Sequence, residues 1–264
     1  MPNNIRNKKI IVTGASSGIG EFISWHIAAY GGMPIMLARS IDKLHEQQKS
    51  IMAEFNSDSF AYKVNLQNIT ELDYTVEKIL QEHGQVHGLI NNAGTGMFAY
   101  VKDMAWEEME QMFRLNVFAL IRITKLILPH FLEHGEGHIV NIASQAGKIS
   151  TPKSAVYAST KHAVLGFTNS LRLEAAADNI NVTSINLGPV RTNFFKTADP
   201  SGNYQKNVDR YMLDPDKVAE KIVRYLFTSK REINLPFWME FGSKLYHLFP
   251  QLMETILKNQ FNKK

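Results

Sequence analysis

The chain has 264 residues, of which 44% are hydrophobic and 20% are charged, and this is the composition of an ordinary globular protein. The formal net charge is +4, from 29 Lys and Arg against 25 Asp and Glu. This small surplus is spread along the chain, so it argues against a nucleic-acid-binding protein.

The chain contains no cysteine, which excludes disulfides, thiolate metal sites and cysteine nucleophiles. A reducing, intracellular compartment is compatible with that composition. The N-terminus shows no apolar core of a secretory signal, and no apolar run approaches the roughly 20 residues that a membrane-spanning helix needs. We therefore expect a cytoplasmic protein with one main domain.

In the first third of the chain, short apolar runs alternate with helical patterns. The runs predict strands at 9–13, 34–38, 60–64 and 86–90, with helices between them at 19–30, 42–55 and 69–82. Strands separated by single helices require right-handed crossovers and a parallel sheet. The predicted class is therefore α/β.

The remaining chain continues the alternation. We predict helices at 106–114, 117–134, 157–177 and 215–228, and strands at 137–143, 180–186 and 232–235. The stretch 190–215 is polar, and we expect a mobile lid or a disordered loop there.

The segment 236–264 is predicted to be an amphipathic extension of a main domain that spans 1–235. Apolar residues recur at helical spacing from Trp238 to Phe261, with a break at Pro250. We expect this tail to pack on its own domain or on a partner subunit. A membrane surface or a long-chain substrate is the alternative contact, less favoured, because the tail is aromatic and ends in cationic residues, Lys258, Lys263 and Lys264.

A glycine-rich turn, Thr13-Gly-Ala-Ser-Ser-Gly-Ile-Gly20, separates the first predicted strand from the first predicted helix. At this place in an open parallel sheet, glycines let the backbone approach a pyrophosphate and the helix N-terminus attracts its charge. The spacing differs from the commoner Gly-x-Gly-x-x-Gly fingerprint. The turn predicts a dinucleotide site.

The residues after the second predicted strand indicate which dinucleotide binds. An acidic residue there would select NAD, but the chain reads Ala38, Arg39, Ser40. A guanidinium binds a 2′-phosphate with two hydrogen bonds, whereas a carboxylate repels it. We predict NADP(H); the alternative is that Arg39 is a surface residue capping a loop.

Tyr157 and Lys161 stand four residues apart on one face of a predicted helix. A free phenol has a pKa of about 10, and a nearby ammonium favours the phenolate, so the pair suits proton transfer near neutral pH. The same spacing is frequent on solvated helix faces, so the pair alone does not establish a site.

Taken together, these motifs resemble the short-chain dehydrogenase/reductase family. The resemblance rests on Thr13-Gly14-x-x-x-Gly18-x-Gly20, Asn91-Asn92-Ala93-Gly94, Ser144 and Tyr157-x-x-x-Lys161, and it covers residues 8 to 235. It implies a Rossmann-like, doubly wound parallel sheet of about seven strands with helices on both faces. It also implies hydride transfer between a nicotinamide and a carbonyl or alcohol.

The resemblance implies four catalytic roles. Tyr157 would be the general acid/base, Lys161 would lower its pKa and hold the nicotinamide ribose, and Ser144 would orient the substrate oxygen. Asn116 would hold a water in the proton relay; the alternative is a buried amide that satisfies nearby backbone groups.

The resemblance also implies a set of cofactor contacts along the carboxyl edge of the sheet. They are Gly14, Ser16, Ser17, Gly18, Ile19, Gly20, Arg39, Ser40, Asn65, Leu66, Asn92, Ala93, Gly94, Tyr157, Lys161, Gly188, Pro189, Val190 and Thr192. Asn65 replaces the aspartate that the family usually has, and Leu187-Gly188-Pro189 replaces its usual Pro-Gly.

We predict an NADP(H)-dependent oxidoreductase whose partner is a small carbonyl or alcohol. Met97, Phe98, Phe194 and Phe195 would make the pocket apolar, which favours a lipid-like, steroid-like or aromatic substrate. A 3-oxoacyl thioester is the competing substrate, and a non-catalytic NADP(H)-binding sensor is the competing class. The apolar faces of 117–131 and 164–173 resemble the helices through which family members pair, so a homodimer or homotetramer is expected.

The histidine pairs His83/His87 and His134/His138 lie in predicted loops. No cysteine or clustered carboxylate completes a metal shell beside them. We expect surface histidines and no metal site.

Overall fold

A computed structural model describes residues 3–261 of the backbone and the side chains of residues 4–256. Within them, seven parallel strands form one sheet in the order β3-β2-β1-β4-β5-β6-β7. The strands are β1 (Lys9–Thr13), β2 (Met33–Ala38), β3 (Phe60–Lys63), β4 (Gly88–Asn91), β5 (Gly137–Ile142), β6 (Ile180–Leu187) and β7 (Glu232–Leu235). The predicted fold is confirmed.

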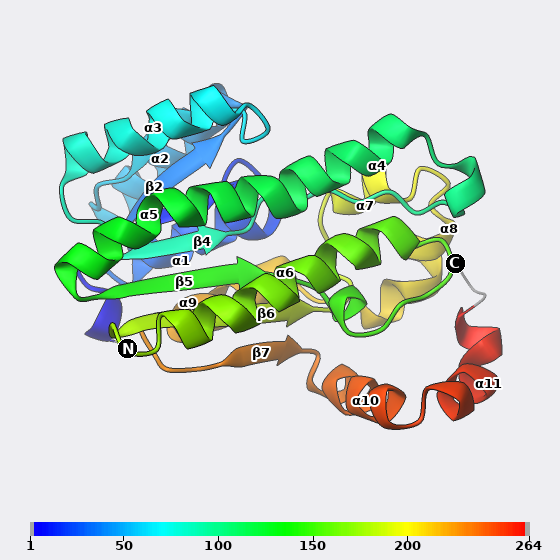
Figure 1. Ribbon diagram of the computed structural model, residues 1–264. Helices are drawn as coiled ribbons and strands as arrows, with labels where there is room; N and C mark the ends of the chain where they lie inside the picture. Colours follow the sequence, from blue (N-terminus) through cyan, green and yellow to red (C-terminus); the bar gives the residue numbers. More distant parts are fainter. Residues whose placement is uncertain (1–2, 262–264) are drawn as a thin grey trace.

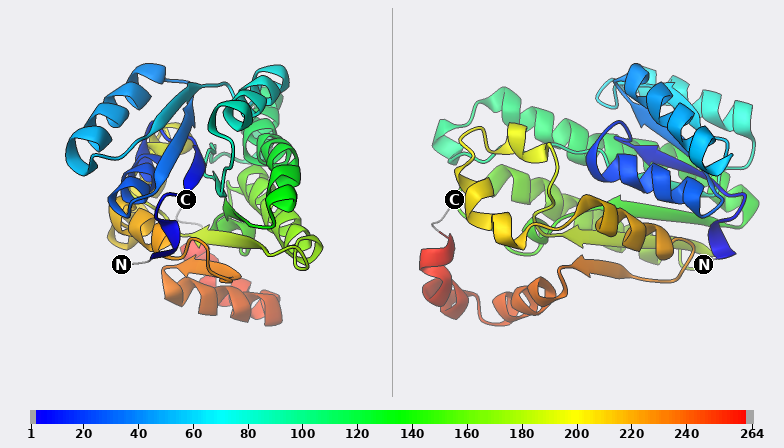
Figure 2. Two further views of the ribbon diagram at one scale, coloured as in Figure 1. Left: turned by 90° about the vertical axis from the view of Figure 1, so that its left-hand side faces the viewer. Right: turned by 180° about the vertical axis from the view of Figure 1, so that it is seen from behind.

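Helices cover both faces of the sheet. They are α1 (Gly18–Ala29), α2 (Ile41–Phe55), α3 (Ile69–His83), α4 (Trp106–Phe113), α5 (Leu120–His134), α6 (Ala155–Glu174), α7 (Phe194–Ala198), α8 (Asn203–Val208), α9 (Pro215–Arg224), α10 (Phe237–Leu248) and α11 (Pro250–Phe261). The helices α3, α5 and α6 lie in front of the sheet in Figure 1, and α1, α2 and α9 lie behind it, as the right view of Figure 2 shows.

Each face of the sheet buries its own apolar core. Ile10, Val12 and Ile90 pack against α1 and α9, whereas Ile11 and Leu89 point to the opposite face and its helices. Successive strand residues alternate between the two faces, so the continuous apolar runs of the sequence supply both cores at once.

The helices begin and end at residues that satisfy their free backbone groups. The Asn68 side chain accepts from the Glu71 N–H at the start of α3. The Asp214 side chain accepts from the Asp216 N–H at the start of α9, whose first residue is Pro215. Asn56, with φ of 48°, ends α2. These local signals explain why most predicted bounds fall within a few residues of the observed ones.

The prediction of separate helices at 106–114 and 117–134 was wrong. The chain stays helical from Trp106 to His134, with a π-helical turn, η3 (Arg114–Ala119), in place of a break. No glycine or proline interrupts 114–119, so the helix absorbs the irregularity as a wider turn.

This continuous helix is long and apolar enough, by composition alone, to cross a membrane, which we did not expect from the sequence. Its most apolar 18-residue window has a mean hydropathy of 1.5, and half of that window is buried inside the protein. Ile123, Ile127 and Phe131 lie in the core against β4 and β5. The high hydropathy of this helix is therefore explained by the apolar side chains that it buries in the core.

The stretch 190–215 is not the disordered loop that was one of the two expectations. The segment folds into α7, α8 and the short turn η5 (Asp209–Tyr211), and it lies across the carboxyl ends of the strands (Figure 2). Phe195 and Ala198 are buried, and the Phe98 N–H donates to the Ala198 carbonyl at 2.8 Å. A few buried apolar side chains thus anchor a stretch whose composition is mostly polar.

Candidate active site

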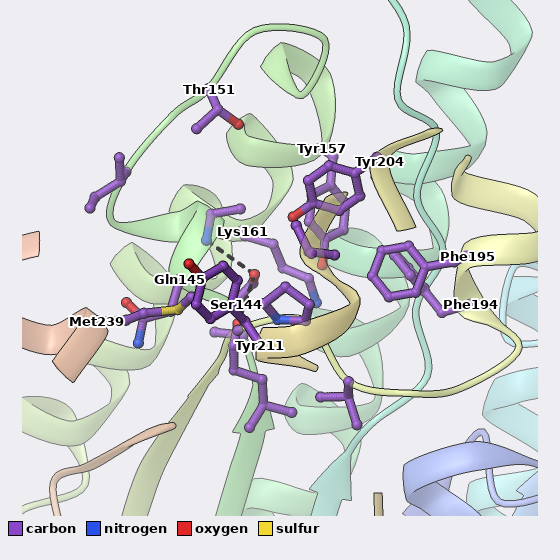
Figure 3. A pocket seen from close by; sticks show the side chains of 18 of the residues that line it. Ser144, Gln145, Thr151, Tyr157, Lys161, Phe194, Phe195, Tyr204, Tyr211 and Met239 are labelled. Atoms are coloured by element: carbon purple, nitrogen blue, oxygen red, sulfur yellow. Dashed lines mark hydrogen bonds between the residues drawn. The ribbon is translucent and has the colours of Figure 1, made fainter. Parts of the chain in front are cut away.

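The carboxyl ends of β1, β4, β5 and β6 meet at one edge of the sheet, which is where open α/β sheets bind ligands. A cavity of about 460 Å³ opens beside this edge. Ser144, Tyr157 and Lys161 line it, as Figure 3 shows. The tertiary structure thus brings three of the four predicted catalytic residues to one wall.

Tyr157 and Ser144 form the chemical centre of the cavity. The Ser144 Oγ donates to the Leu187 carbonyl at 3.2 Å and accepts from the Ala146 N–H at 3.1 Å. Burial raises the pKa of Tyr157 to about 12, and the neighbouring Ser144 hydroxyl partly opposes that rise. The phenol is therefore protonated throughout the neutral range.

Lys161 stands one helical turn from Tyr157 but does not pair with the phenol oxygen. Its Nζ lies 5.8 Å from the centre of the Tyr157 ring and donates to the Ile142 carbonyl at 2.9 Å. Burial lowers the pKa of Lys161 to about 8. The pKa of Tyr157 reflects its burial and the Ser144 hydroxyl, so the expected lowering by Lys161 stays a prediction.

Asn116 lies in the π-helical turn η3 and is buried. Its Oδ1 accepts from the Thr95 N–H at 2.8 Å, and its Nδ2 donates to the Thr95 carbonyl at 2.8 Å and to Thr160 Oγ1 at 3.1 Å. The structure therefore shows the alternative role of Asn116, in which its buried amide satisfies backbone groups. Asn116 fixes the loop after β4 beside Lys161, since a Cβ added to Gly94 would stand 3.2 Å from Asn116 Oδ1 and 3.7 Å from Lys161 Nζ.

The glycine-rich turn has the backbone that its sequence predicts. Gly14 and Gly18 have φ of +66° and +59°, a region that side chains disfavour. A Cβ at Gly20 would lie 2.4 Å from the Gly14 carbonyl oxygen, so only glycine lets α1 start this close to the turn. Ser17, the N-cap, makes no side-chain cap hydrogen bond to α1. The Ser17 side chain therefore leaves the first N–H groups of α1 available, and an anion site needs such N–H groups.

Asn92 and Ala93 hold the turn against the end of β4. The Asn92 Nδ2 donates to the Thr13 carbonyl at 2.9 Å, and the N–H groups of Asn92 and Ala93 both donate to Thr13 Oγ1 at 3.0 Å. From the other side, Thr192 Cγ2 would lie 3.3 Å from a Cβ at Gly18. The loops after β1, β4 and β6 thus enclose one cleft.

The predicted cofactor residues do not all line the cavity. Ile19, Asn92, Gly94, Gly188, Pro189, Val190 and Thr192 line the cavity together with Tyr157 and Lys161. Arg39, Ser40 and Asn65 are exposed at the ends of β2 and β3, outside the cavity lining, and Ser16 and Ser17 line a separate surface depression beside α1. Leu66 is buried in the core, so only its backbone is available for a ligand.

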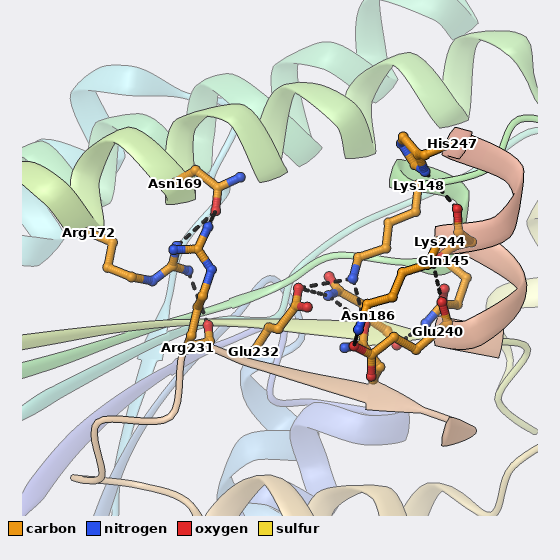
Figure 4. Close-up of polar contacts among 12 residues, drawn as sticks. Gln145, Lys148, Asn169, Arg172, Asn186, Arg231, Glu232, Glu240, Lys244 and His247 are labelled. Carbon is orange, nitrogen blue, oxygen red and sulfur yellow. Dashed lines mark hydrogen bonds and ion pairs between the residues drawn. The ribbon is translucent and has the colours of Figure 1, made fainter. Parts of the chain in front are cut away.

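A polar network holds the loop of Ser144 and Gln145 to the last two strands (Figure 4). Gln145 Nε2 donates to the Asn186 carbonyl at 3.1 Å. Lys148 Nζ donates to Glu232 Oε2 and to Asn234 Oδ1, both at 2.9 Å. The position of Ser144 therefore depends on contacts with β6 and β7.

Aromatic and apolar side chains form most of the cavity wall. Phe98, Phe194 and Phe195 line it as expected, but Met97 does not. The segment that follows Phe195 contributes to the wall, and so does the tail, whose lining residues the sequence did not identify; together they supply Tyr204, Tyr211, Trp238, Met239, Gly242, Tyr246 and Met253. The aromatic content of both stretches was the available signal.

The histidines do not behave as one class. His138 lies within β5 and is buried, contrary to our expectation of a surface loop. Its Nδ1 accepts from the Phe227 N–H at 2.8 Å and its Nε2 lies 2.9 Å from Thr183 Oγ1, so both ring nitrogens have protein partners. Among the described residues, no group of three or more His, Asp or Glu is placed to hold a metal ion.

Known proteins resemble this chain over most of its length. Residues 8–202 match the family described as short chain dehydrogenase. An uncharacterized oxidoreductase of Bacillus subtilis is 33% identical over 286 residues, covering 96% of this chain and 99% of the relative.

Solved structures agree with the fold. The L-sorbose reductase of Gluconobacter frateurii, solved with NADPH and L-sorbose, is 27% identical, with a TM-score of 0.79 over 89% of this chain and 97% of the reductase. A short chain dehydrogenase/reductase from Burkholderia phymatum, solved with NAD, has a TM-score of 0.84 over 94% of this chain and 95% of its own, and at 20% identity it shows the fold alone. The chain belongs to the short-chain dehydrogenase/reductase family of oxidoreductases.

Proposed function

We propose that this oxidoreductase uses NADPH to reduce the carbonyl of an apolar substrate, or performs the reverse reaction on the alcohol. The observation that carries the proposal is that Ser144, Tyr157 and Lys161 line one largely apolar cavity, with the Lys161 Nζ 5.8 Å from the centre of the Tyr157 ring. A lipid-like, steroid-like or aromatic ketone is the substrate class that fits this wall.

The residues at the sheet edge fit a dinucleotide. The turn from Gly14 to Gly20 would hold the pyrophosphate on the α1 N-terminus, and Asn92, Gly94 and Thr192 would line the rest of the cleft. Exposed Arg39, with Ser40 beside it, would bind a 2′-phosphate. The bound NADPH supplies the hydride.

The chain's own residues handle the proton and the substrate oxygen. Tyr157, whose pKa of about 12 keeps it protonated, would donate its phenol proton to the carbonyl oxygen. Ser144 would donate a hydrogen bond to the same oxygen as negative charge develops on it. Lys161, held by the Ile142 carbonyl, would place a positive charge beside both groups. The protonated tyrosine is the form that acts as the acid in the reduction.

The cavity wall argues for an apolar substrate. A sugar would need several polar partners, but aromatic rings surround Tyr157. The centres of the Phe98 and Phe194 rings lie 5.8 and 5.7 Å from the centre of the Tyr157 ring. A 3-oxoacyl thioester is the second candidate, because Trp238 and Met253 extend the apolar lining along the tail.

The test is NADPH consumption with five matched substrates: a long-chain ketone, a steroid ketone, an aromatic ketone, a ketose and a 3-oxoacyl thioester. We expect the highest kcat/KM with one of the three apolar ketones. A preference for the ketose would contradict the substrate class, and a preference for the thioester would favour the second candidate. NADP(H) binding without turnover on any of them would identify a cofactor-binding sensor instead.

We further propose a cytoplasmic homodimer or homotetramer that pairs through helices α5 and α6. Exposed apolar residues on this side, Phe118 and Leu173, are 59% and 75% accessible in the single chain. Light scattering at micromolar concentration should give at least twice the monomer mass of 30.0 kDa. A monomer would contradict this assembly.

A further inference from the structure

The outer side of the two C-terminal helices exposes a row of large apolar side chains. We call it the outer stripe, and its members are between 55% and 78% accessible: Phe237, Phe241, Leu248, Phe249, Leu252 and Ile256. Monomeric proteins rarely expose apolar patches of this kind unless the patch binds something. The helices α10 and α11 follow the carboxyl end of β7, the last strand of the sheet (Figure 1).

The outer stripe and the cavity lie on different sides of the same helix. Phe237, Phe241 and Leu248 recur at intervals that place them on one face of α10. Met239 and Tyr246, on another face, line the cavity. The inner face therefore already has a partner within the chain, whereas the outer face has none among the described residues.

An aromatic rim joins the outer stripe to the cavity. Trp238 and Tyr211 line the cavity and are also 56% and 42% accessible, so they mark where it opens to the surface. Their ring centres are 5.9 Å apart, and the Arg210 guanidinium lies 4.5 Å from the centre of the Tyr211 ring. Trp and Tyr beside a cation are typical of residues that sit at a membrane–water interface.

The charge of this region is positive. Residues 236–264 contain four lysines and two glutamates, a net charge of +2. Lys206 and Arg210 add exposed cations on α8 and η5, while the exposed carboxylate of Asp209 is paired with Arg191. Of the lysines in 236–264, Lys244 is the one whose side chain is described, and it bonds Glu240 at 2.8 Å. The positive net charge of the segment and the exposed Arg210 beside Tyr211 favour an anionic lipid surface.

We propose that the outer stripe docks on an anionic lipid surface, with its apolar side chains in the headgroup boundary and the rim of Trp238 and Tyr211 at the interface. Docking would bring the mouth of the cavity to the lipid, so a long-chain apolar substrate would enter without crossing water. The entry of substrate rests on the proposed function, whereas the docking itself does not. The sequence left a membrane surface as the less favoured contact of the tail. The proposal assigns that contact to the outer stripe and names anionic lipid as its partner.

The experiment is flotation of the full chain with vesicles of phosphatidylcholine containing phosphatidylserine, and with vesicles of phosphatidylcholine alone. We expect binding to the anionic vesicles that weakens with added salt, and weaker binding to the neutral ones. The variant Phe237→Ser, Phe241→Ser, Leu248→Ser should bind about tenfold less or weaker still, since three apolar contacts are lost. The control variant Ile69→Ser, Tyr74→Ser removes side chains that are 61% and 67% exposed on α3, far from the tail, and should bind like the parent.

Flotation, molar mass and NADPH turnover together separate the outcomes. Absence of flotation with anionic vesicles, or an equal loss in both variants, overturns the proposal. A change of molar mass in the triple variant without vesicle binding by the parent means that the stripe is a contact between copies of the chain, and this also overturns it. NADPH turnover of a water-soluble ketone without vesicles should be the same in parent and triple variant. A parent that floats but consumes no NADPH on any ketone would refute the proposed function and leave the docking surface standing.

Discussion

Lys161 donates a hydrogen bond of 2.9 Å from its Nζ to the carbonyl oxygen of Ile142, the last residue of β5. The ammonium is 6% exposed, and burial lowers its pKa to about 8. The backbone carbonyl thus holds the cation of the site at the end of a strand, beside the tyrosine that would donate the proton.

This placement predicts the upper limb of the pH profile. Lys161 is charged below its pKa and neutral above it, so kcat/KM for the reduction should fall by about tenfold per pH unit above about pH 8. Initial rates at limiting NADPH and ketone measure it. In Lys161→Arg the charge persists over the whole range, so the remaining activity should lack this limb. A parent profile that stays flat to pH 10 would contradict the assigned role.

Tyr157→Phe removes the proposed proton donor and keeps the ring. Turnover should drop by about 10²- to 10⁴-fold, the usual contribution of a general acid, while NADP(H) still raises the melting temperature. Tyr74→Phe, at a 67% exposed tyrosine, is the matched control and should keep full activity. Turnover that survives Tyr157→Phe would rule out this residue as the acid.

Arg39→Asp should reverse the cofactor preference, because a carboxylate repels the 2′-phosphate and accepts from the ribose hydroxyls. In the parent, NADP(H) should raise the melting temperature more than NAD(H) at equal concentration, with a stabilisation of about 2.7 kcal/mol at 100 times the dissociation constant. Lys49→Asp, at an exposed position further along α2, is the charge-matched control. An unchanged preference in Arg39→Asp would mean that this guanidinium does not touch the phosphate.

His138 should make stability depend on pH. Burial lowers its pKa to about 3, whereas in the unfolded chain it titrates near 6.5. The unfolded state therefore binds one more proton between these values, and the free energy of unfolding should fall as pH drops below 6.5, by up to about 1.4 kcal/mol per unit. Urea unfolding at several pH values measures the slope.

His138→Gln removes the titrating ring. The variant should be less stable at pH 7, because the Phe227 N–H and Thr183 lose their partners in the ring, but its stability should vary less between pH 6.5 and 4. Equal slopes in parent and variant would show that other groups dominate the acid limb.

Phe98→Ala should weaken the binding of bulky apolar ketones. The Phe98 ring packs edge-on against Tyr157 and also against Tyr204, at 5.8 and 5.0 Å between ring centres, so its loss widens the cavity beside the reacting group. KM for a steroid ketone should rise by about tenfold, with a smaller change for a small ketone. Tyr74→Ala, at a 67% exposed aromatic residue on α3, is the control. Similar effects on both substrates would place Phe98 outside the substrate wall.

The sequence by itself determined the fold class and the identity of the candidate site. Apolar runs of strand length, separated by single helices, leave few arrangements other than a parallel sheet. The glycines at 14, 18 and 20 are needed by local backbone geometry, and Tyr157 and Lys161 share a helix face through their spacing alone. Such features depend on neighbours in the chain, and a sequence displays those directly.

Tertiary structure decided what depends on residues far apart in the chain. Burial by distant elements raises the pKa of Tyr157, and the Ile142 carbonyl rather than the phenol receives the Lys161 ammonium. The Asn116 side chain bonds both the N–H and the carbonyl of Thr95, because η3 packs beside the loop after β4. The buried side chain of Phe195 anchors the polar stretch 190–215, which is therefore helical and packed. The desolvation and hydrogen-bond energies behind these results arise only when the distant partners meet, and local composition does not encode them.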